Sequence, residues 1–445
     1  MSDLMKDSGY KWVGDIPVSW DTKRIKYIAT LKGRIGWQGL TSDEYQEEGA
    51  CLITGTDFVN GKINWDSCVH VPLNRWEEAS EIQIEDGDLL ITKDGTVGKV
   101  AIVSEMTEKT SLNSGVLRII PKKEYDKKYL FWVLQSNVFW NWFNYKNAGN
   151  STILHLYQND FNEFIYAFPD LKEQQAIAKF LDKRCKQIDE IINDLGLQIK
   201  KLEDYKVSLI NECVTKGIRN NTRFKDSKVS WIGDIPEKWN VMRVLKTLRM
   251  PITDGPHVTP ELQDSGIPFV SAEAVSTGNG RINFENFWGY ISIDFYNECC
   301  RKYKPEVNDV YMIKSGATTG KVAILDKEIV FNIWSPLAVF RANDKVIHPY
   351  FLFYSLQANF FQMQVQLGWT YGTQQNIGMR TLEHLKICVP PLDEQNEIVC
   401  YLNLKCSDID IAISHKKNQL EIMKTYKSSL IYEYVTGKKR VKVGE

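Results

Sequence analysis

The 445-residue chain lacks the long apolar run that a membrane helix requires, since no stretch reaches about 18 apolar residues. Its first residues, Met1-Ser-Asp-Leu-Met-Lys-Asp7, do not have the pattern of a signal peptide. Nine cysteines form no Cys-x-x-Cys pair and no Cys/His group at zinc spacing, so we expect buried, reduced thiols. These absences predict a cytoplasmic protein without a membrane span or a metal site.

Positive charge is also scarce for a protein that would bind nucleic acid alone. The net charge is −1; residues 1–168 carry 18 Lys and Arg against 23 Asp and Glu, and residues 219–391 carry 19 against 16. Affinity for duplex DNA depends strongly on neutralised phosphates. If the chain binds DNA, we expect a partner to supply part of the positive surface.

What the sequence does contain is a long internal repeat. Trp12-Val-Gly-Asp-Ile-Pro-Val-Ser-Trp20 returns as Trp231-Ile-Gly-Asp-Ile-Pro-Glu-Lys-Trp239, and Tyr205-Lys-Val-Ser-Leu-Ile returns as Tyr426-Lys-Ser-Ser-Leu-Ile. The spacing of about 220 residues is far longer than a solenoid unit of about 20–50 residues. Each copy is therefore a whole domain with its connector, and the repeat predicts a pseudo-two-fold molecule that meets a two-part target.

The two domains read as β-rich. Short apolar or alternating runs, bounded by turns with Gly, Asp and Asn, predict α+β domains at residues 1–168 and 219–391. Matching amphipathic helices are expected late in each domain, over residues 129–142 and 350–364. Both copies keep Trp12, Trp20, Trp231 and Trp239, which suits residues of a shared scaffold.

The connectors at residues 169–218 and 392–440 predict long helices. Asp170 can cap the first helix, with Glu173 three residues later. Apolar residues then recur at close to the 3.5-residue spacing of a coiled-coil seam. The expected seam positions are Ile188, Ile192, Leu195, Ile199, Leu202, Tyr205, Leu209 and Cys213, and Ile409, Ile413, Lys416, Leu420, Met423, Tyr426, Leu430 and Tyr434. Because each helix buries one stripe, we expect the two to pack against each other, antiparallel.

This order of elements resembles the specificity subunit of type I restriction–modification systems. The resemblance covers essentially the whole chain and is carried by Leu171-Lys-Glu-Gln174, its repeat Leu392-Asp-Glu-Gln395, and the Tyr-Lys-x-Ser-Leu-Ile helix ends. It implies two target-recognition domains that each read one half of a bipartite site in double-stranded DNA. It also implies antiparallel spacer helices that dock two methyltransferase subunits, with endonuclease/translocase subunits in the same complex. S-adenosylmethionine, ATP and Mg²⁺ would then be bound by the partners, with no cofactor or metal on this chain.

The residues agree with a chain that has no catalytic centre of its own. The nearest string to the Asn-Pro-Pro-Tyr motif of adenine methyltransferases is Val389-Pro-Pro-Leu392. Gly95-Thr-Val-Gly98-Lys99 and Gly316-Ala-Thr-Thr-Gly320-Lys321 depart from a P-loop, which has four residues between its glycines and Ser or Thr after the lysine. These turns either bind a DNA phosphate through backbone N–H, Thr and Lys groups, or are purely structural. Two alternatives stay open here: an enzyme that uses these turns, and a coiled-coil scaffold for protein binding.

Candidate DNA contacts lie in these turns and in loops where the two copies diverge. Arg, Asn, Gln and His can read base edges, and Lys and Thr suit phosphates. The candidates in the first domain are Arg34, Gln38, Lys93, Thr96, Lys99, Asn150 and Ser151, and those in the second are His257, Thr259, Lys314, Thr318, Lys321, Thr373, Gln374 and Asn376. Trp37 and Trp369 could stack on bases, but core positions are the more usual place for tryptophan.

Overall fold

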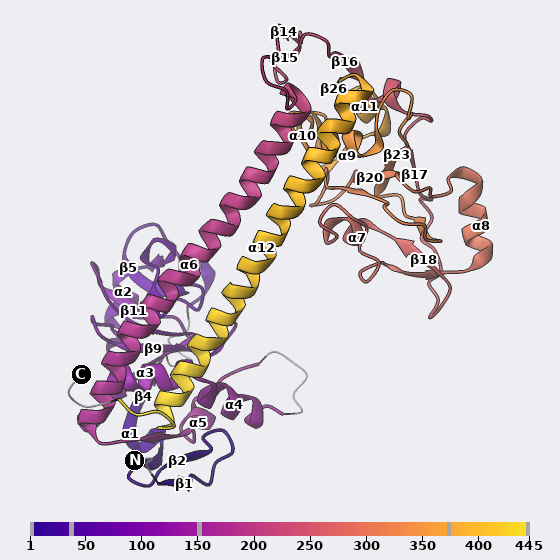
Figure 1. Cartoon of the computed structure of the whole chain (residues 1–445). Coiled ribbons are helices and arrows are strands. Elements are labelled where there is room, and N and C mark those ends of the chain that lie inside the picture. The colour runs from indigo at the N-terminus through magenta and orange to yellow at the C-terminus, as the bar shows by residue number, and fades with distance from the viewer. Residues whose placement is uncertain (1–3, 35–39, 149–153, 372–374, 442–445) are drawn as a thin grey trace. The chain divides into compact units, whose positions relative to one another are not determined.

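A computed structural model describes residues 4–34, 40–148, 154–371 and 375–441. The chain divides into two compact units, Met1–Gly196 with Asn418–Glu445, and Leu197–Lys417 (Figure 1). Each unit contains one β-rich domain and one half of each of two long helices, α6 (Leu171–Lys216) and α12 (Leu392–Val435). The predicted α+β fold, with two β-rich domains and a pair of long helices, is confirmed.

The first domain is built on a four-stranded antiparallel sheet in the order β10-β9-β12-β4. Its strands are β4 (Ala29–Gly33), β9 (Leu89–Thr92), β10 (Val100–Ile102) and β12 (Val116–Pro121). A three-stranded sheet in the order β11-β5-β8 lies beside it, in which β11 runs parallel to β5. Its strands are β5 (Ala50–Ile53), β8 (Val69–Val71) and β11 (Thr110–Leu112).

The second domain repeats this arrangement. Its four-stranded sheet has the order β17-β23-β20-β21, and its three-stranded sheet has the order β19-β18-β22 with β22 parallel to β18. The strands are β17 (Thr253–Asp254), β18 (Ile267–Val270), β19 (Gly289–Ile291), β20 (Val310–Ile313), β21 (Val322–Ile324), β22 (Asn332–Ile333) and β23 (Leu337–Phe340).

The central strands read as continuous apolar runs because both of their faces are covered. Along β20, Val310 and Met312 enter one hydrophobic core, which also contains the helix residues Leu209 and Ile398. The alternate residue Tyr311 enters a second core on the other side of the sheet. The strand β9 divides its side chains between two cores in the same way. Because successive side chains point to opposite faces of the sheet, each central strand contributes both to the core beside the long helices and to the core on the other face.

Shorter elements complete both copies. Edge hairpins and pairs are β1 (Met5–Asp7) with β2 (Asp15–Pro17), β3 (Asp21–Arg24) with β13 (Ile165–Phe168), β6 (Phe58–Val59) with β7 (Lys62–Ile63), β14 (Phe224–Asp226) with β15 (Asp234–Pro236), β16 (Asn240–Arg243) with β26 (Lys386–Val389), and β24 (Thr370–Tyr371) with β25 (Gln375–Asn376). Short helices are α1 (Ile25–Ile28), α2 (Leu73–Glu77), α5 (Gln158–Phe161), α7 (Ala272–Ser276), α8 (Ile293–Lys302) and α11 (Met379–His384).

The helix expected late in each domain is wrong in one respect, because each is broken into two. The pairs are α3 (Lys127–Gln135) with α4 (Asn137–Lys146), and α9 (Pro349–Gln357) with α10 (Asn359–Leu367). At the first break Ser136 is extended, and its hydroxyl accepts a hydrogen bond from the backbone N–H of Val138, so it caps α4. The second break has extended Ala358 in the same place.

The repeated Glu-Gln motif attaches the start of each long helix to its domain. The predicted cap is confirmed, since Asp170 Oδ1 accepts from the N–H of Glu173 at 3.0 Å. In the second copy the buried Gln395 accepts from the N–H of His348 at 2.7 Å and donates to the carbonyls of Val346 and Pro390 at 3.0 and 2.8 Å. Gln174 makes the matching contacts to Asp126 and Pro169 in the first copy. These glutamines therefore fix the angle at which each helix leaves its domain.

Within each unit the two helix halves run antiparallel, and one charged pair takes a place predicted to be apolar. Tyr205 and Tyr426 are 55% and 51% exposed, so their assignment to the seam is wrong. The next residues face the partner helix instead: Lys206 donates to both carboxylate oxygens of Asp410 at 2.7 Å in the second unit. Lys427 does the same to Asp189 in the first unit, at 2.6 and 2.7 Å.

The cysteines are free, and Cys51, Cys185, Cys213, Cys299, Cys388 and Cys406 are buried. Burial raises the pKa of Cys388 to about 12, so its thiol stays protonated at neutral pH. Cys400 is exposed, which the sequence pattern did not predict.

Candidate nucleic-acid interface

Both Gly-Lys turns connect antiparallel strands. Residues 93–99 join β9 to β10, and residues 314–321 join β20 to β21. Gly98 and Gly320 have φ of 82° and 95°, the left-handed region that favours glycine, and their N–H groups return to the carbonyls of Thr92 and Ile313. A P-loop instead joins a strand to a helix. The nucleotide-hydrolase interpretation of these turns is therefore not supported.

In the first domain this turn lies against two other loops. The Thr96 hydroxyl donates to the carbonyl of Gly55 at 2.8 Å, and the exposed Lys99 amine lies 3.5 Å from the same carbonyl. Asp94 meets the ring Nδ1 of His155 at 2.7 Å. Sequence reasoning chose Thr96 and Lys99 and missed Gly55, Asp94 and His155, because their convergence depends on segments about 40 to 60 residues away along the chain.

The lysine before each turn has the same backbone position in both copies. The N–H of Lys93 donates to Gly115 and its carbonyl accepts from Leu156; the N–H of Lys314 donates to Pro336 and its carbonyl accepts from Ile377. The Lys314 side chain, only 12% exposed, extends toward Asp254, with its Nζ 3.3 Å from Oδ2. The two copies thus share a backbone and use it with different side-chain partners.

Asp254, which is 1% exposed, gathers three basic groups in the second domain. Besides Lys314, its carboxylate contacts Lys302 Nζ at 2.5 Å and His257 Nε2 at 3.0 Å. Burial alone would raise the pKa of Asp254, but the hydrogen bond from Lys302 and the nearby positive charges hold it below its ordinary value. The structure therefore brings together the predicted residues His257 and Lys314 and adds Lys302, which no pattern in the sequence marks.

Arg34, a predicted DNA contact, is 6% exposed and faces the protein interior. Its guanidinium donates to the Leu112 carbonyl at 2.8 Å and to the Ser111 hydroxyl at 3.2 Å, both on β11. Burial, and then the charge of Arg75, lower its pKa. This placement favours a structural role, in which Arg34 ties the two sheets of the first domain together.

The remaining candidates are divided between surface positions and residues that the structure does not describe. Thr259 and Lys321 are exposed, and Thr318 is half-buried in the turn. Asn376 is exposed on β25 and pairs through its backbone with Ser315, beside the turn. Gln38, Asn150, Ser151, Thr373 and Gln374, together with Trp37, lie outside the described residues.

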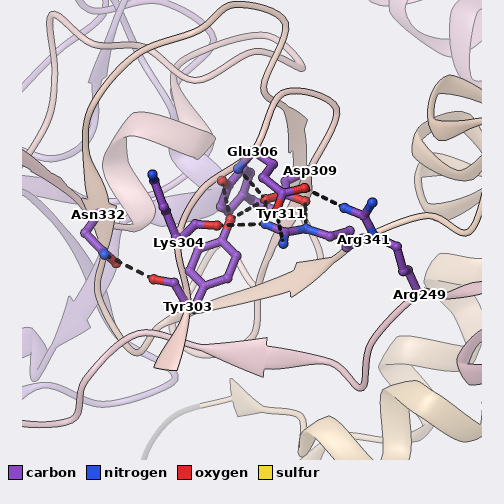
Figure 2. A network of polar contacts seen from close by, with 8 residues as sticks. All are labelled: Arg249, Tyr303, Lys304, Glu306, Asp309, Tyr311, Asn332 and Arg341. Carbon is purple, nitrogen blue, oxygen red and sulfur yellow. Dashed lines mark hydrogen bonds and ion pairs between the residues drawn. The ribbon is translucent and has the colours of Figure 1, made fainter. Parts of the chain in front are cut away.

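The shared motif residues serve the scaffold. Trp20 and Trp239 are buried, and Trp369 packs at the edge of the second domain's core, whereas Trp231 is 42% exposed. Figure 2 shows the network around Asp309, which directly precedes β20 as Asp88 precedes β9 in the first copy. Asp309 is 1% exposed and accepts two hydrogen bonds from Arg341 at 2.7 Å and one from the Tyr303 hydroxyl at 2.6 Å.

The first copy has a similar pair, in which Arg118 Nε lies 2.9 Å from the buried Asp88, although Arg118 lies within β12 and Arg341 follows the end of β23. Both copies thus use an acidic residue before the central strand as a structural anchor. Residues common to the copies fix the fold, and the loops at the turn edge of each domain differ in charge and partners.

Comparison with known proteins finds one family model in both copies. The family model described as "Type I restriction modification DNA specificity domain" matches residues 17–201 and 225–422. The chain belongs to this family. The type I restriction enzyme MjaVIII specificity subunit of Methanocaldococcus jannaschii is 26% identical over 443 residues, which cover 96% of this chain and 94% of that one. The EcoBI specificity subunit of Escherichia coli is 22% identical over 80% of this chain and 72% of its own length.

A solved structure reported for complex assembly and conformational transition of the type I R-M system contains a chain with the same fold. The TM-score is 0.69 at 16% identity, with 95% of this chain and 99% of that chain covered. This chain is thus a type I specificity subunit with two recognition domains, and the enzyme and scaffold alternatives are not supported. Among the helices of the described residues, none is long and apolar enough to cross a membrane.

Proposed function

We propose that the chain is the non-catalytic DNA-reading subunit of a type I restriction–modification complex. The first recognition domain reads one half of a bipartite site in double-stranded DNA, and the second reads the other. The observation that carries this proposal is the contrast between copies. Asp88 and Asp309 each pair with an arginine in the same part of the scaffold. The equivalent turns differ: Asp94 pairs with His155 in the first domain, and Ser315 forms a backbone bridge with Asn376 in the second. Different loops on one scaffold suit an asymmetric target.

The long helices supply the other part of the proposal. They set the unread gap between the half-sites and dock two methyltransferase subunits, to which endonuclease/translocase subunits are added. S-adenosylmethionine, ATP and Mg²⁺ act on those partners, and this chain contributes position and sequence selection. Exposed apolar side chains along both helices support a docking surface, among them Leu197, Leu404, Ile411 and Ile422, each more than 50% exposed.

A domain exchange tests the division of labour. Residues 219–391 are replaced by the equivalent domain of another specificity subunit, and the chain is expressed with its methyltransferase in a host without other adenine methylation. Methylome sequencing should show one half-site changed, with the other half-site and the gap retained. A reciprocal exchange of residues 1–168 is the matched control and should change the opposite half. Alteration of both halves by a single exchange would contradict the proposal.

A further inference from the structure

Positive charge exceeds what Asp254 needs for neutralisation. One buried carboxylate requires about one cation, yet Lys302, Lys314 and His257 all lie within 3.3 Å of it. The side chains of Lys302 and His257 are 51% and 70% exposed. The cluster therefore presents the positive charge of a second lysine beside the His257 ring, and Asp254 holds both groups in place.

The backbone under the cluster has little freedom. Asp254 lies on β17, paired with Ala338, and a Cβ added to the next residue, Gly255, would come within 2.0 Å of the carbonyl oxygen of Ile333. Such a contact with backbone cannot be relieved by a side-chain movement, so the position requires glycine. The loop that carries His257 thus starts from a fixed point, which holds the ring beside Asp254.

In the first domain a glycine stands where the second domain has Asp254. Strand β4 pairs Gly33 with Leu117 in the register where β17 pairs Asp254 with Ala338, so Gly33 takes the place of Asp254. The following residue is Arg34, whose charge is buried against β11. The charges of the two domains also differ: residues 1–168 carry 18 basic and 23 acidic residues, and residues 219–391 carry 19 basic and 16 acidic residues.

We propose that Lys302 and His257, held with Lys314 by Asp254, bind a phosphate of the DNA backbone and form a clamp without a counterpart among the described residues of the first recognition domain. The inference rests on the proposed function and names the groups by which this domain attaches to DNA. A 170 Å³ cavity beside Asp254 is also lined by Glu298, so two carboxylates oppose an anion inside it. The contact is therefore assigned to the outer surface of the cluster, where the Lys302 amine has donors besides the one that meets Asp254. Asp254 is a positioning residue.

Salt dependence of binding tests the clamp in the full chain. The probe is a 30-base-pair duplex of random sequence, titrated between about 50 and 200 mM salt, because the slope of log Kobs against log salt counts neutralised phosphates. Lys302→Gln should make the slope shallower by about 0.9. Arg301→Gln removes the same charge from the neighbouring residue of α8, outside the Asp254 cluster, and should leave the slope unchanged. Equal slopes for the two variants would overturn the clamp.

Asp254→Asn separates positioning from simple charge. The variant gains one unit of net positive charge, so electrostatics alone would steepen the slope. If Asp254 positions the cations, the slope becomes shallower because the contact is lost. A steeper slope would show that Asp254 only opposes DNA. Failure of the unmodified chain to bind any duplex even together with its methyltransferase would contradict the proposed function itself, whereas binding that is unaffected by Lys302→Gln contradicts the clamp alone.

Discussion

The two lysine–aspartate pairs between the long helices should stabilise the fold much more than an exposed pair between the same helices. Lys206 with Asp410 and Lys427 with Asp189 have lysines only 18% and 23% exposed, and each lysine bonds both carboxylate oxygens. Lys417 with Glu203 also joins the helices, but at 3.4 Å with side chains 59% and 52% exposed. Hydrogen bonds to charged groups contribute about 1.5–3 kcal/mol, and exposed ion pairs about 0.2–1 kcal/mol.

Discounted for the partial exposure of the aspartates, we expect coupling free energies of about 1–2 kcal/mol for each half-buried pair and below about 0.5 kcal/mol for the exposed one. The assay is a double-mutant cycle on urea unfolding, with Lys206→Met, Asp410→Leu and their combination, and the same design for Lys417 and Glu203. Repeating it at about 1 M salt should remove most of the exposed coupling and little of the half-buried one. Equal coupling in both cycles would refute the reasoning.

Three other outcomes follow from the structure. Gln395→Ala should lower the free energy of unfolding, measured in urea, by about 2–4 kcal/mol, because it leaves the His348 N–H and two carbonyls without their partner. The control is Gln362→Ala, at a half-buried position of α10, and an equal loss in both variants would contradict the anchoring role of Gln395. Removing one heptad from each long helix, residues 193–199 and 414–420, should shorten the unread gap by about three base pairs, since seven residues at ~1.5 Å each span about 10 Å. A methylome with an unchanged gap would show that the helices do not set the distance between the half-sites. A fragment of residues 1–222 should form a homodimer in light scattering, because Lys206 of one copy can meet Asp189 of the other as Lys427 does in the whole chain. Asp189→Lys should abolish the dimer, and adding Lys206→Asp to that variant should restore it. A dimer that is insensitive to both changes would contradict this pairing.

The sequence predicted features that local chemistry or the repeat decides. The Asp170 cap, the long helices and the turns at Gly98 and Gly320 follow from residues close together in the chain. The predicted seam is off by one residue at Tyr205. A step of three residues followed by one of four has the same average spacing as a step of four followed by one of three, so the spacing alone does not distinguish the two positions. The seam follows Lys206, whose aliphatic stem packs while its amine reaches Asp410.

Long-range pairing set the limit of prediction for the candidate site. Asp254 meets Lys302 48 residues later, and no local pattern marks either residue as a partner of the other. Arg34 was expected to reach DNA because arginines in loops commonly do, but β11, which passes 77 residues later, offers it a carbonyl and a hydroxyl. Parallel pairing of β11 with β5 has the same character, since it depends on a crossover through most of the domain.

The two units differ in when synthesis can complete them. The second unit is one continuous segment, Leu197–Lys417, whereas the first also requires Asn418–Glu445. In the first unit the Tyr129 hydroxyl donates to the carbonyl of Val435, 306 residues later, and Gly437 lies against Pro17. The domain that leaves the ribosome first is therefore finished last, and its core waits with an open side until the final helix arrives. A message cut short between Lys417 and Val435 would yield an intact second unit beside an unfinished first one.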